Sequence, residues 1–406
     1  MLMHATRSAH AEAPRVFLAE PTNYTNVLDA FVGKGLPDFR LSLGFLSTSE
    51  TSTIQRENPS HSQAGSYSHV AFASLDRTAK QIWISAEVGL FQDLMLTLNT
   101  PFVLEDSLTL AATPYAVQSG LLDHAVGADY DSRIRDGVPY INAGLAYGLI
   151  NQYRTPNLPT WIVRLDAQIS TGQAMTPCLH GQSCFRGAGR GTVRVQGETR
   201  FSYRYRLVEP YGGFSYAREA VTTAQDNYWP NGTLPNDLDR NPPSRAGWTA
   251  GLSLIPWEDR ERMQRIAVDG RFSATYVSRG RDYSPLFDIL GTSPLLSPDM
   301  STAATTSARF TGMTTIDAHV DMRGDLELLV RAARYVRFRF GLGISAATAH
   351  LITGASPCAA AVTSSGTCEG GQDNPSYQPI IDRPGNRFRI TDIIGVSLSA
   401  SAAGQF

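Results

Sequence analysis

The chain has 406 residues, a formal net charge of −2 and 18% charged residues, where soluble globular domains usually have roughly 25%. Its near-neutral balance, without any block of Lys or Arg, gives no basis for a nucleic-acid partner. No run approaches the roughly 18 consecutive apolar residues of a transmembrane helix, so a crossing of a membrane would have to use β-strands.

The first 37 residues lie before any strand pattern. Residues 1–12 are typical of a leader-like or disordered tail, because Ala9-His10-Ala11 has the form of a cleavage site without an apolar segment before it. Residues 13–37 are expected to form a periplasmic segment with a short helix at 25–31, and a second short helix is expected at 119–126. Residues 38–406 then form one domain.

Alternation of apolar and polar residues with a period of two recurs along this domain and predicts antiparallel β-strands. The clearest example begins at Thr192, where Val193 and Val195 alternate with Arg194 and Gln196. Twelve segments show the pattern: 38–50, 79–91, 93–104, 139–149, 159–172, 191–207, 209–222, 246–257, 262–280, 314–330, 332–352 and 387–406.

The connections between these segments are alternately short and long. The short ones centre on 91–93, 150–158, 208–210, 256–261 and 331–334, and the long ones cover 51–78, 105–138, 173–190, 223–245, 281–313 and 353–386. Short periplasmic turns and long extracellular loops on an even number of strands are the architecture of outer-membrane barrels. The sequence therefore predicts an all-β, up-and-down transmembrane barrel of about 12 strands in the bacterial outer membrane, with both termini in the periplasm.

Four cysteines form two local pairs in the long loops, Cys178 with Cys184 and Cys358 with Cys368. We expect both pairs to be disulfides in an oxidising compartment. Suitably spaced histidines for zinc are missing, and neither a cofactor nor a metal is expected.

The last predicted strand ends the chain on Phe406. Phe388, Ile390, Ile394 and Val396 belong to one apolar phase, which predicts that they face lipid and that Asp392, in the same phase, lies above the apolar band. This strand resembles the C-terminal strand of outer-membrane proteins, and the resemblance implies that Phe406 is the signal read by the barrel-assembly machinery. Aromatic residues near strand ends, Tyr211 among them, suit interfacial girdles.

Residues in the opposite phase should face the lumen of the barrel. The charged residues expected there are Arg164, Asp166, Arg194, Glu198, Arg200, Arg204, Arg265, Asp269, Arg271, Asp317, His319, Asp321, Arg323, Arg337 and Arg339. The predicted strand 314–330 is rich in acidic residues, and its neighbours 262–280 and 332–352 are basic. Opposite charges would therefore face each other across these strand pairs. Two interpretations stay open: the rows line a selective pore, or their salt bridges fill and close the lumen.

His319 is the one histidine predicted inside the wall, between Asp317 and Asp321. An aspartate-oriented histidine can act as a general base, but no G-x-S-x-G motif accompanies it. A salt-bridged wall histidine is the preferred interpretation, so the chain is expected not to be an enzyme, and a hydrolase centred on His319 is the distant alternative.

Two hairpin regions resemble Gram-negative outer-membrane proteins of the broad porin-like and hydrophobic-compound-channel grouping: INAGLAYGLINQYRTPNLPTWIVRLDAQISTG and RFSYRYRLVEPYGGFSYA. EVGLFQDLMLTLNTPFVL and SRGRDYSPLFDILG resemble barrel proteins of myxobacteria. The first functional hypothesis is a porin-like channel that admits small solutes through the lumen lined by the charged residues above. The alternative is a non-transporting barrel whose disulfide-braced surface loops serve adhesion, partner binding or envelope structure. Expected partners are outer-membrane lipid, lipopolysaccharide and the assembly machinery.

Overall fold

The computed structural model describes residues 21, 24–28, 38–63, 66–121, 129–179, 183–229, 241–259, 261–296, 310–358, 367–371 and 373–406. Twelve antiparallel strands form its barrel in chain order. They are β1 (Phe39–Gln63), β2 (Ser66–Phe91), β3 (Leu94–Ala112), β6 (Tyr140–Ile150), β7 (Thr160–Ser170), β8 (Thr192–Ser202), β9 (Val208–Val221), β10 (Arg245–Asp259), β11 (Gln264–Val277), β14 (His319–Ala333), β15 (Val336–Ala347) and β17 (Phe388–Gln405).

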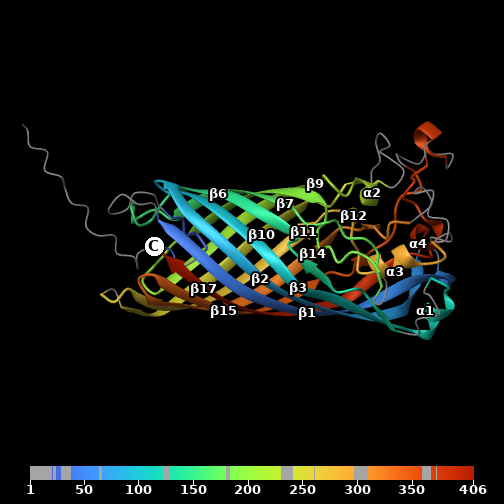
Figure 1. The fold of residues 1–406 in the computed structure, drawn as a ribbon, viewed down its shortest axis with the longest axis horizontal. Coiled ribbons are helices and arrows are strands. Elements are labelled where there is room, and N and C mark those ends of the chain that lie inside the picture. The colour runs from blue at the N-terminus through green and yellow to red at the C-terminus, as the bar shows by residue number, and fades with distance from the viewer. Residues whose placement is uncertain are drawn as a thin grey trace, which may run out of the picture.

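The barrel is closed by pairing of its first and last strands. β1 and β17 are antiparallel from Arg40 opposite Gln405 to Arg56 opposite Phe388. The chain ends in this seam, where Phe39 and Phe406 exchange two backbone hydrogen bonds of 3.1 and 2.8 Å. The C-terminus lies at the end of the barrel opposite the helices (Figure 1). We call the C-terminal end the short-turn end and the other the loop end.

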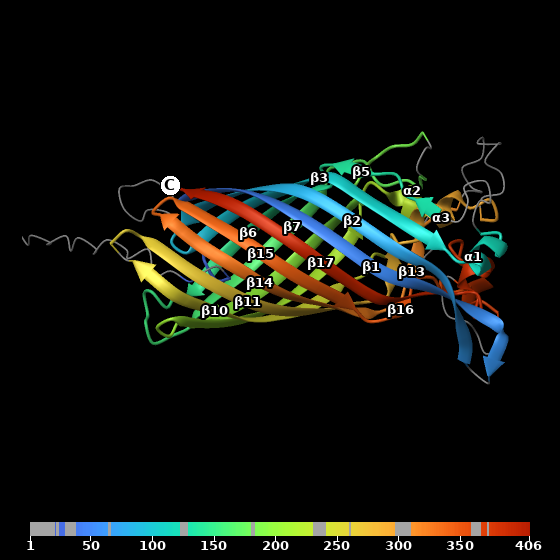
Figure 2. The ribbon, with the colours of Figure 1, turned by 90° about the horizontal axis from the view of Figure 1, so that it is seen from below.

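All twelve predicted strands are confirmed, but the first three are longer than the alternation indicates. Most of 51–78, predicted as a long loop, continues β1 and β2, which have 25 and 26 residues. Roughly 10 residues suffice to cross a bilayer, so the rest of this hairpin lies beyond it. Its tip bends away from the remaining strands (Figure 2).

Other boundaries differ locally. The turn after β8 lies at Arg206, whose φ is 55°, with Tyr205 and Val208 exchanging backbone hydrogen bonds. The prediction placed this turn at 208–210, but Pro210 lies within β9, where its carbonyl accepts a hydrogen bond from Tyr203. A left-handed residue turns the chain here instead of the proline.

Neither predicted short helix is found among the described residues of its range; 29–31 and 122–126 lie outside them. Of 25–31 the structure describes Thr25–Leu28, which is not helical. The second helix was predicted at 119–126, whereas α1 covers Pro114–Gln118, where the Thr113 hydroxyl accepts a hydrogen bond from the Ala116 amide. This N-cap and the proline at the start of the helix favour the earlier position.

The outer face of the barrel is apolar. On β1, Leu41, Leu43 and Phe45 are 47%, 56% and 40% exposed. Large apolar side chains repeat on the outer face of β7, β15 and β17. A closed barrel leaves no backbone edge unpaired, and an apolar exterior of this kind is stable only against lipid. The barrel is therefore a transmembrane one.

A β-bulge at Asp392 changes which residues of β17 face outward. Asp392 has a φ of 54°, and the register shifts where Thr51 and Thr53 pair with Ile394 and Thr391. Beyond this bulge Ile390 is 3% exposed, whereas Ile394 is 54% exposed. The prediction that Phe388 and Ile390 share the lipid-facing phase is wrong because the extra residue inverts the alternation.

Small elements connect the strands at the loop end. They are α1, β4 (Asp129–Asp131), β5 (Arg135–Gly137), α2 (Gln225–Tyr228), β12 (Gly280–Asp282), α3 (Phe287–Thr292), β13 (Thr314–Ile316), β16 (His350–Leu351), η4 (Glu369–Gly371) and α4 (Pro379–Asp382). None of the described helices is long and apolar enough to cross a membrane. Buried apolar side chains from these elements and the tips of β1 to β3 form one cluster, the loop-end core, which includes Phe72, Leu110, Leu290, Ile352 and Phe388.

Candidate functional site: an arginine-lined cavity inside the barrel

The inward rows of neighbouring strands bring charged residues together. On β7 and β8, Arg164 lies opposite Glu198 and Gln168 lies opposite Arg194. On β11, β14 and β15, Arg265 lies opposite Arg331, which in turn lies opposite Arg337. Since strand side chains alternate between faces, each of these residues projects into the same interior.

A cavity of about 500 Å³ occupies this interior. Among the described residues, one carboxylate, Glu87, lines it beside eight arginines, and we call it the arginine cavity: its arginines are Arg40, Arg164, Arg200, Arg265, Arg271, Arg331, Arg337 and Arg339. A second space of about 270 Å³ adjoins it and is lined by Asp166, Arg194 and Glu198 besides Arg164 and Arg200.

Ion pairs connect many of these arginines to the wall. Arg164 donates two hydrogen bonds to Asp166, of 2.6 and 2.7 Å. Arg271 contacts both Asp325 at 3.2 Å and Glu327 at 3.0 Å. The cavity is therefore a partly neutralised, strongly hydrogen-bonded polar space.

The remaining predicted lumen residues lie in four other places, one of them at the loop end of β14. Asp269 is 2% exposed and accepts hydrogen bonds from Tyr211 and Ser253, so it is part of the wall. Arg323 pairs with Asp325 at 2.8 Å and donates to Ser397. Arg204 lies beyond β8 at the short-turn end, paired with Glu258.

Asp317, His319 and Asp321 lie together at the loop end of β14. The His319 ring stacks on that of His350 with centroids 3.8 Å apart. His319 Nδ1 lies 2.9 Å from the Asp317 carbonyl, and its Nε2 lies 3.6 Å from Asp321. Within the described residues no serine hydroxyl bonds to His319.

Residues 24–28 occupy the barrel interior near its short-turn end. The Tyr24 hydroxyl donates to Glu198 at 3.2 Å, and its carbonyl accepts from Arg200 at 2.9 Å. Thr25 and Ser202 share a hydrogen bond of 2.6 Å, and Asn26 accepts one from Arg40 at 3.0 Å. We call Tyr24–Leu28 the inserted segment.

The Tyr24 side chain packs closely against the barrel wall. Its ring stacks on Tyr211 with centroids 4.7 Å apart, and the Arg200 guanidinium lies 4.7 Å from its centroid. A Cβ on Gly213 would lie 2.7 Å from the Tyr24 hydroxyl, and one on Gly251 would lie 2.3 Å from the Tyr211 ring. Tyr211 thus faces inward, and its assignment to an outer girdle is wrong.

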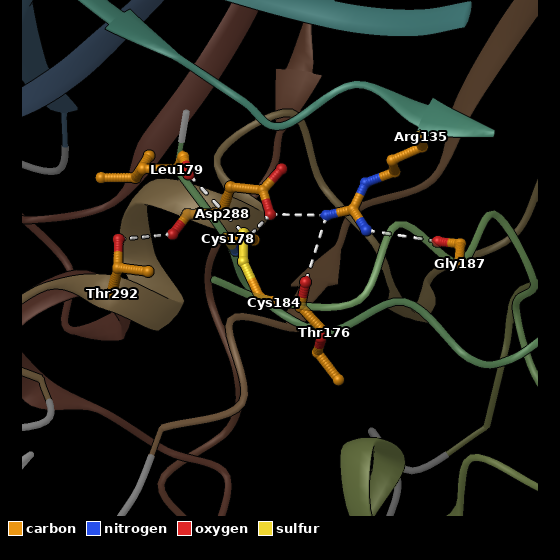
Figure 3. The surroundings of a disulfide bond; sticks show 8 residues. All are labelled: Arg135, Thr176, Cys178, Leu179, Cys184, Gly187, Asp288 and Thr292. Carbon is orange, nitrogen blue, oxygen red and sulfur yellow. Dashed lines mark hydrogen bonds and ion pairs between the residues drawn. A yellow bond between two sulfur atoms is a disulfide. The ribbon is translucent and has the colours of Figure 1, made fainter. Parts of the chain in front are cut away.

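At the loop end the predicted disulfides are confirmed, Cys178–Cys184 and Cys358–Cys368. The first lies beside Asp288 of α3, which accepts hydrogen bonds from the Cys178 amide at 2.8 Å and from Arg135 at 2.5 Å (Figure 3). Arg135 also donates to the Thr176 carbonyl. A buried ion pair and the hydrogen bond from the Cys178 amide therefore hold α3 against the neighbouring loops.

α4 is held in a similar way. Asp382 accepts hydrogen bonds of 2.8 to 3.0 Å from the amides of Gly354, Ala355 and Gln378. Burial raises the pKa of the Asp382 carboxyl to about 6, and the three amides oppose this rise.

Comparison with known proteins adds little at the level of sequence. No family model matches the chain, and no curated relative matches it. An outer-membrane channel from Pseudomonas putida F1 covers 90% of this chain and 95% of its own, with 8% identity and a TM-score of 0.40. A Pseudomonas aeruginosa FadL homologue covers 92% and 91%, with 8% identity and a TM-score of 0.35. The outer-membrane protease OmpT of Escherichia coli covers 91% and 96%, with 8% identity and a TM-score of 0.29.

Scores this low carry no argument about activity, so the assignment depends on the chain's own geometry. A closed, even-numbered antiparallel barrel with an apolar exterior is the architecture of bacterial outer-membrane proteins. Inside it lie a charged cavity, an inserted segment at one end and an apolar loop-end core at the other.

Three residues of the barrel interior were not predicted from the sequence: Arg331, Glu327 and Tyr24. Arg331 was assigned to a short turn, but it lies in β14 and lines the cavity. Glu327 has the alternation of an inward residue and could have been found from that signal. Tyr24 has none, because its contacts on the wall are with residues 174 and 187 positions away, Glu198 and Tyr211.

Proposed function

We propose that this protein is an outer-membrane channel for small polar solutes, with the arginine cavity on the solute path. The observation that carries the proposal is a polar space of about 500 Å³ inside a transmembrane barrel. A barrel needing only structural stability could fill its interior with side chains, as barrels of about eight strands do. In the same proposal the short-turn end faces the periplasm, which is the usual orientation of such barrels.

The inserted segment gives this channel a narrow inner end. Its contacts to Glu198, Ser202 and Arg40 come from two sides of the wall. Solute leaving the cavity in this direction would have to pass the segment or displace it. We therefore expect small conductance steps from the native protein.

One observation favours the alternative of a barrel that presents its loops. The loop-end core buries large apolar side chains such as Phe72, Leu110 and Phe388, and two disulfides brace the same region. Such order is more than an open vestibule requires. It would suit a surface that binds a partner or contributes to the envelope.

Single-channel recording of the refolded protein in a planar bilayer separates the two. Folding is first established by heat-modifiable mobility on a gel. Reproducible conductance steps support the channel, and their absence from correctly folded protein contradicts it and leaves the loop surface as the functional part. Phe406, 72% exposed, remains the proposed assembly signal, to be tested by deleting it and measuring membrane insertion in cells.

A further inference from the structure

The arginines and carboxylates of the barrel interior differ in how they meet the cavity. Arg271 forms ion pairs with Asp325 and Glu327. The Arg271 side chain is 25% exposed, whereas those of Asp325 and Glu327 are 8% and 10% exposed. The same holds for Arg200 with Glu198, at 20% and 10%. The Arg40–Glu87 pair is the exception, at 9% and 21%. In the pairs of Arg271 and Arg200 the carboxylate therefore lies deeper in the wall than the guanidinium group. Arg265 and Arg331 are 5% and 4% exposed and line the cavity with little exposed surface.

Three arginines on adjacent strands concentrate this positive charge. Arg265 on β11, Arg331 on β14 and Arg337 on β15 are consecutive register partners, and all three line the cavity. Directly opposite residues of one face have Cβ atoms about 5 Å apart, and like charges in such positions are destabilising. We call these three residues the arginine row.

Buried acids reduce this charge without reaching the space. Asp269 and Glu209 are 2% and 1% exposed, and neither lines the cavity. Of the ionisable groups in the described part of the chain, a solute entering the cavity therefore meets guanidinium groups and one carboxylate, Glu87. A guanidinium presents a planar pair of N–H donors that matches the two oxygens of a carboxylate or phosphate.

We infer that the arginine cavity selects anionic solutes and that the arginine row is the subsite that holds their carboxylate or phosphate group. This inference rests on the proposed channel function and names its substrate class. The charge that a cavity wall presents to solute determines which ions enter and how long they stay. An anion with two or more charged groups could contact the row and a further arginine, such as Arg271 or Arg339, together.

The test compares the native protein with the double variant Arg331→Gln, Arg337→Gln. Its matched control is Arg262→Gln, because the Arg262 side chain is 78% exposed in a short turn and lies outside the cavity. A single Arg337→Gln variant serves if the double variant does not fold. Reversal potentials are measured in a potassium chloride gradient, and block of the current is measured with inorganic pyrophosphate and with citrate.

We expect the native channel to prefer chloride over potassium and to be blocked by at least one of the two anions. The double variant should lose most of the chloride preference and need about tenfold or more anion for block, because it loses hydrogen bonds between charged groups. The control should behave as the native protein. Stronger block by pyrophosphate would assign phosphate as the recognised group, and stronger block by citrate would assign carboxylate.

Preference for potassium, or a double variant with unchanged selectivity and block, would overturn the inference and leave the channel function intact. A silent native protein would contradict the channel instead. Calorimetry with the same two anions then decides separately: binding that the double variant loses supports an anion site, and absence of binding to the native protein overturns it.

Discussion

Replacement of Tyr24 by alanine should release the inserted segment. The change removes the stacking on Tyr211, worth about 0.5–1.5 kcal/mol, and the cation–π contact with Arg200, worth about 0.5–2 kcal/mol. It also removes the hydroxyl hydrogen bond to Glu198, worth about 1 kcal/mol. Because these contacts share partners, we expect a combined loss of about 2–3 kcal/mol. That shifts the ratio of docked to released segment by roughly 30- to 150-fold.

Bilayer recording measures the consequence directly. Tyr24→Ala should raise the open probability or the step conductance of the channel, and Tyr24→Phe, which keeps both ring contacts, should raise it much less. Tyr205→Ala is the control, because Tyr205 is 62% exposed in the turn after β8. If Tyr24→Ala records the same current as the native protein and this control, the inserted segment is not the barrier that limits conduction.

Three other changes test the wall and the loop end. Arg204→Gln should leave ion selectivity unchanged. It should lower the free energy of unfolding in urea by about 1–3 kcal/mol, since Glu258 would keep its charge without this partner. Altered selectivity would place Arg204 on the solute path. Arg135→Ala breaks a buried ion pair with Asp288 and should lower the stability of the loop end by about 3–5 kcal/mol, measured as faster proteolysis. An unchanged rate of proteolysis would contradict a stabilising role for this ion pair. Because burial raises the pKa of Asp382 to about 6, its contribution to α4 docking is complete below pH 3.8 and is lost as the pH rises through 6. Asp382→Asn should abolish this pH dependence in amide exchange, and a dependence that persists would have another source.

The strands could be predicted because lipid and water act on opposite faces of the same chain. Each wall residue must suit one of these two environments. In strands such as β7 and β8 the alternation therefore indicates directly which side chains point to lipid and which point to the lumen. The prediction fails where the constraint ends. Beyond the membrane β1 and β2 continue without a lipid face, and at Asp392 one extra residue reverses the facing of all that lies beyond it.

The inserted segment could not be predicted for a different reason. Residues 24–28 are too few to show a period, and they have no regular secondary structure beyond a turn. Their position depends on partners far along the chain, such as Glu198, Ser202 and Arg40. A sequence pattern reports the environment of each residue along one strand, but it does not report which distant segment fills the space in front of that strand.

The inward charges were predicted as rows, yet their rows alone suggested a balanced lumen. Asp325 and Glu327 belong to the same inward phase of β14 as Arg323 and Arg331. The sequence therefore predicts that carboxylates and guanidinium groups face the lumen equally. The structure separates Arg323 from Asp325 by depth, with side chains 43% and 8% exposed, because the short carboxylate remains near the backbone while the longer arginine extends beyond it. Side-chain length therefore leaves the Arg323 guanidinium more exposed than the Asp325 carboxylate with which it pairs.

This argument also explains why arginine is so strongly preferred over lysine, of which the chain has only Lys34 and Lys80. Arg164 donates to both oxygens of Asp166 and also to the Thr97 hydroxyl. A planar guanidinium can keep such wall contacts through some of its five N–H groups while others face the cavity. An ammonium group is a compact point charge, and engaging Asp166 would withdraw it from the space. Arginine thus lets one residue neutralise the wall and present positive charge to solute together.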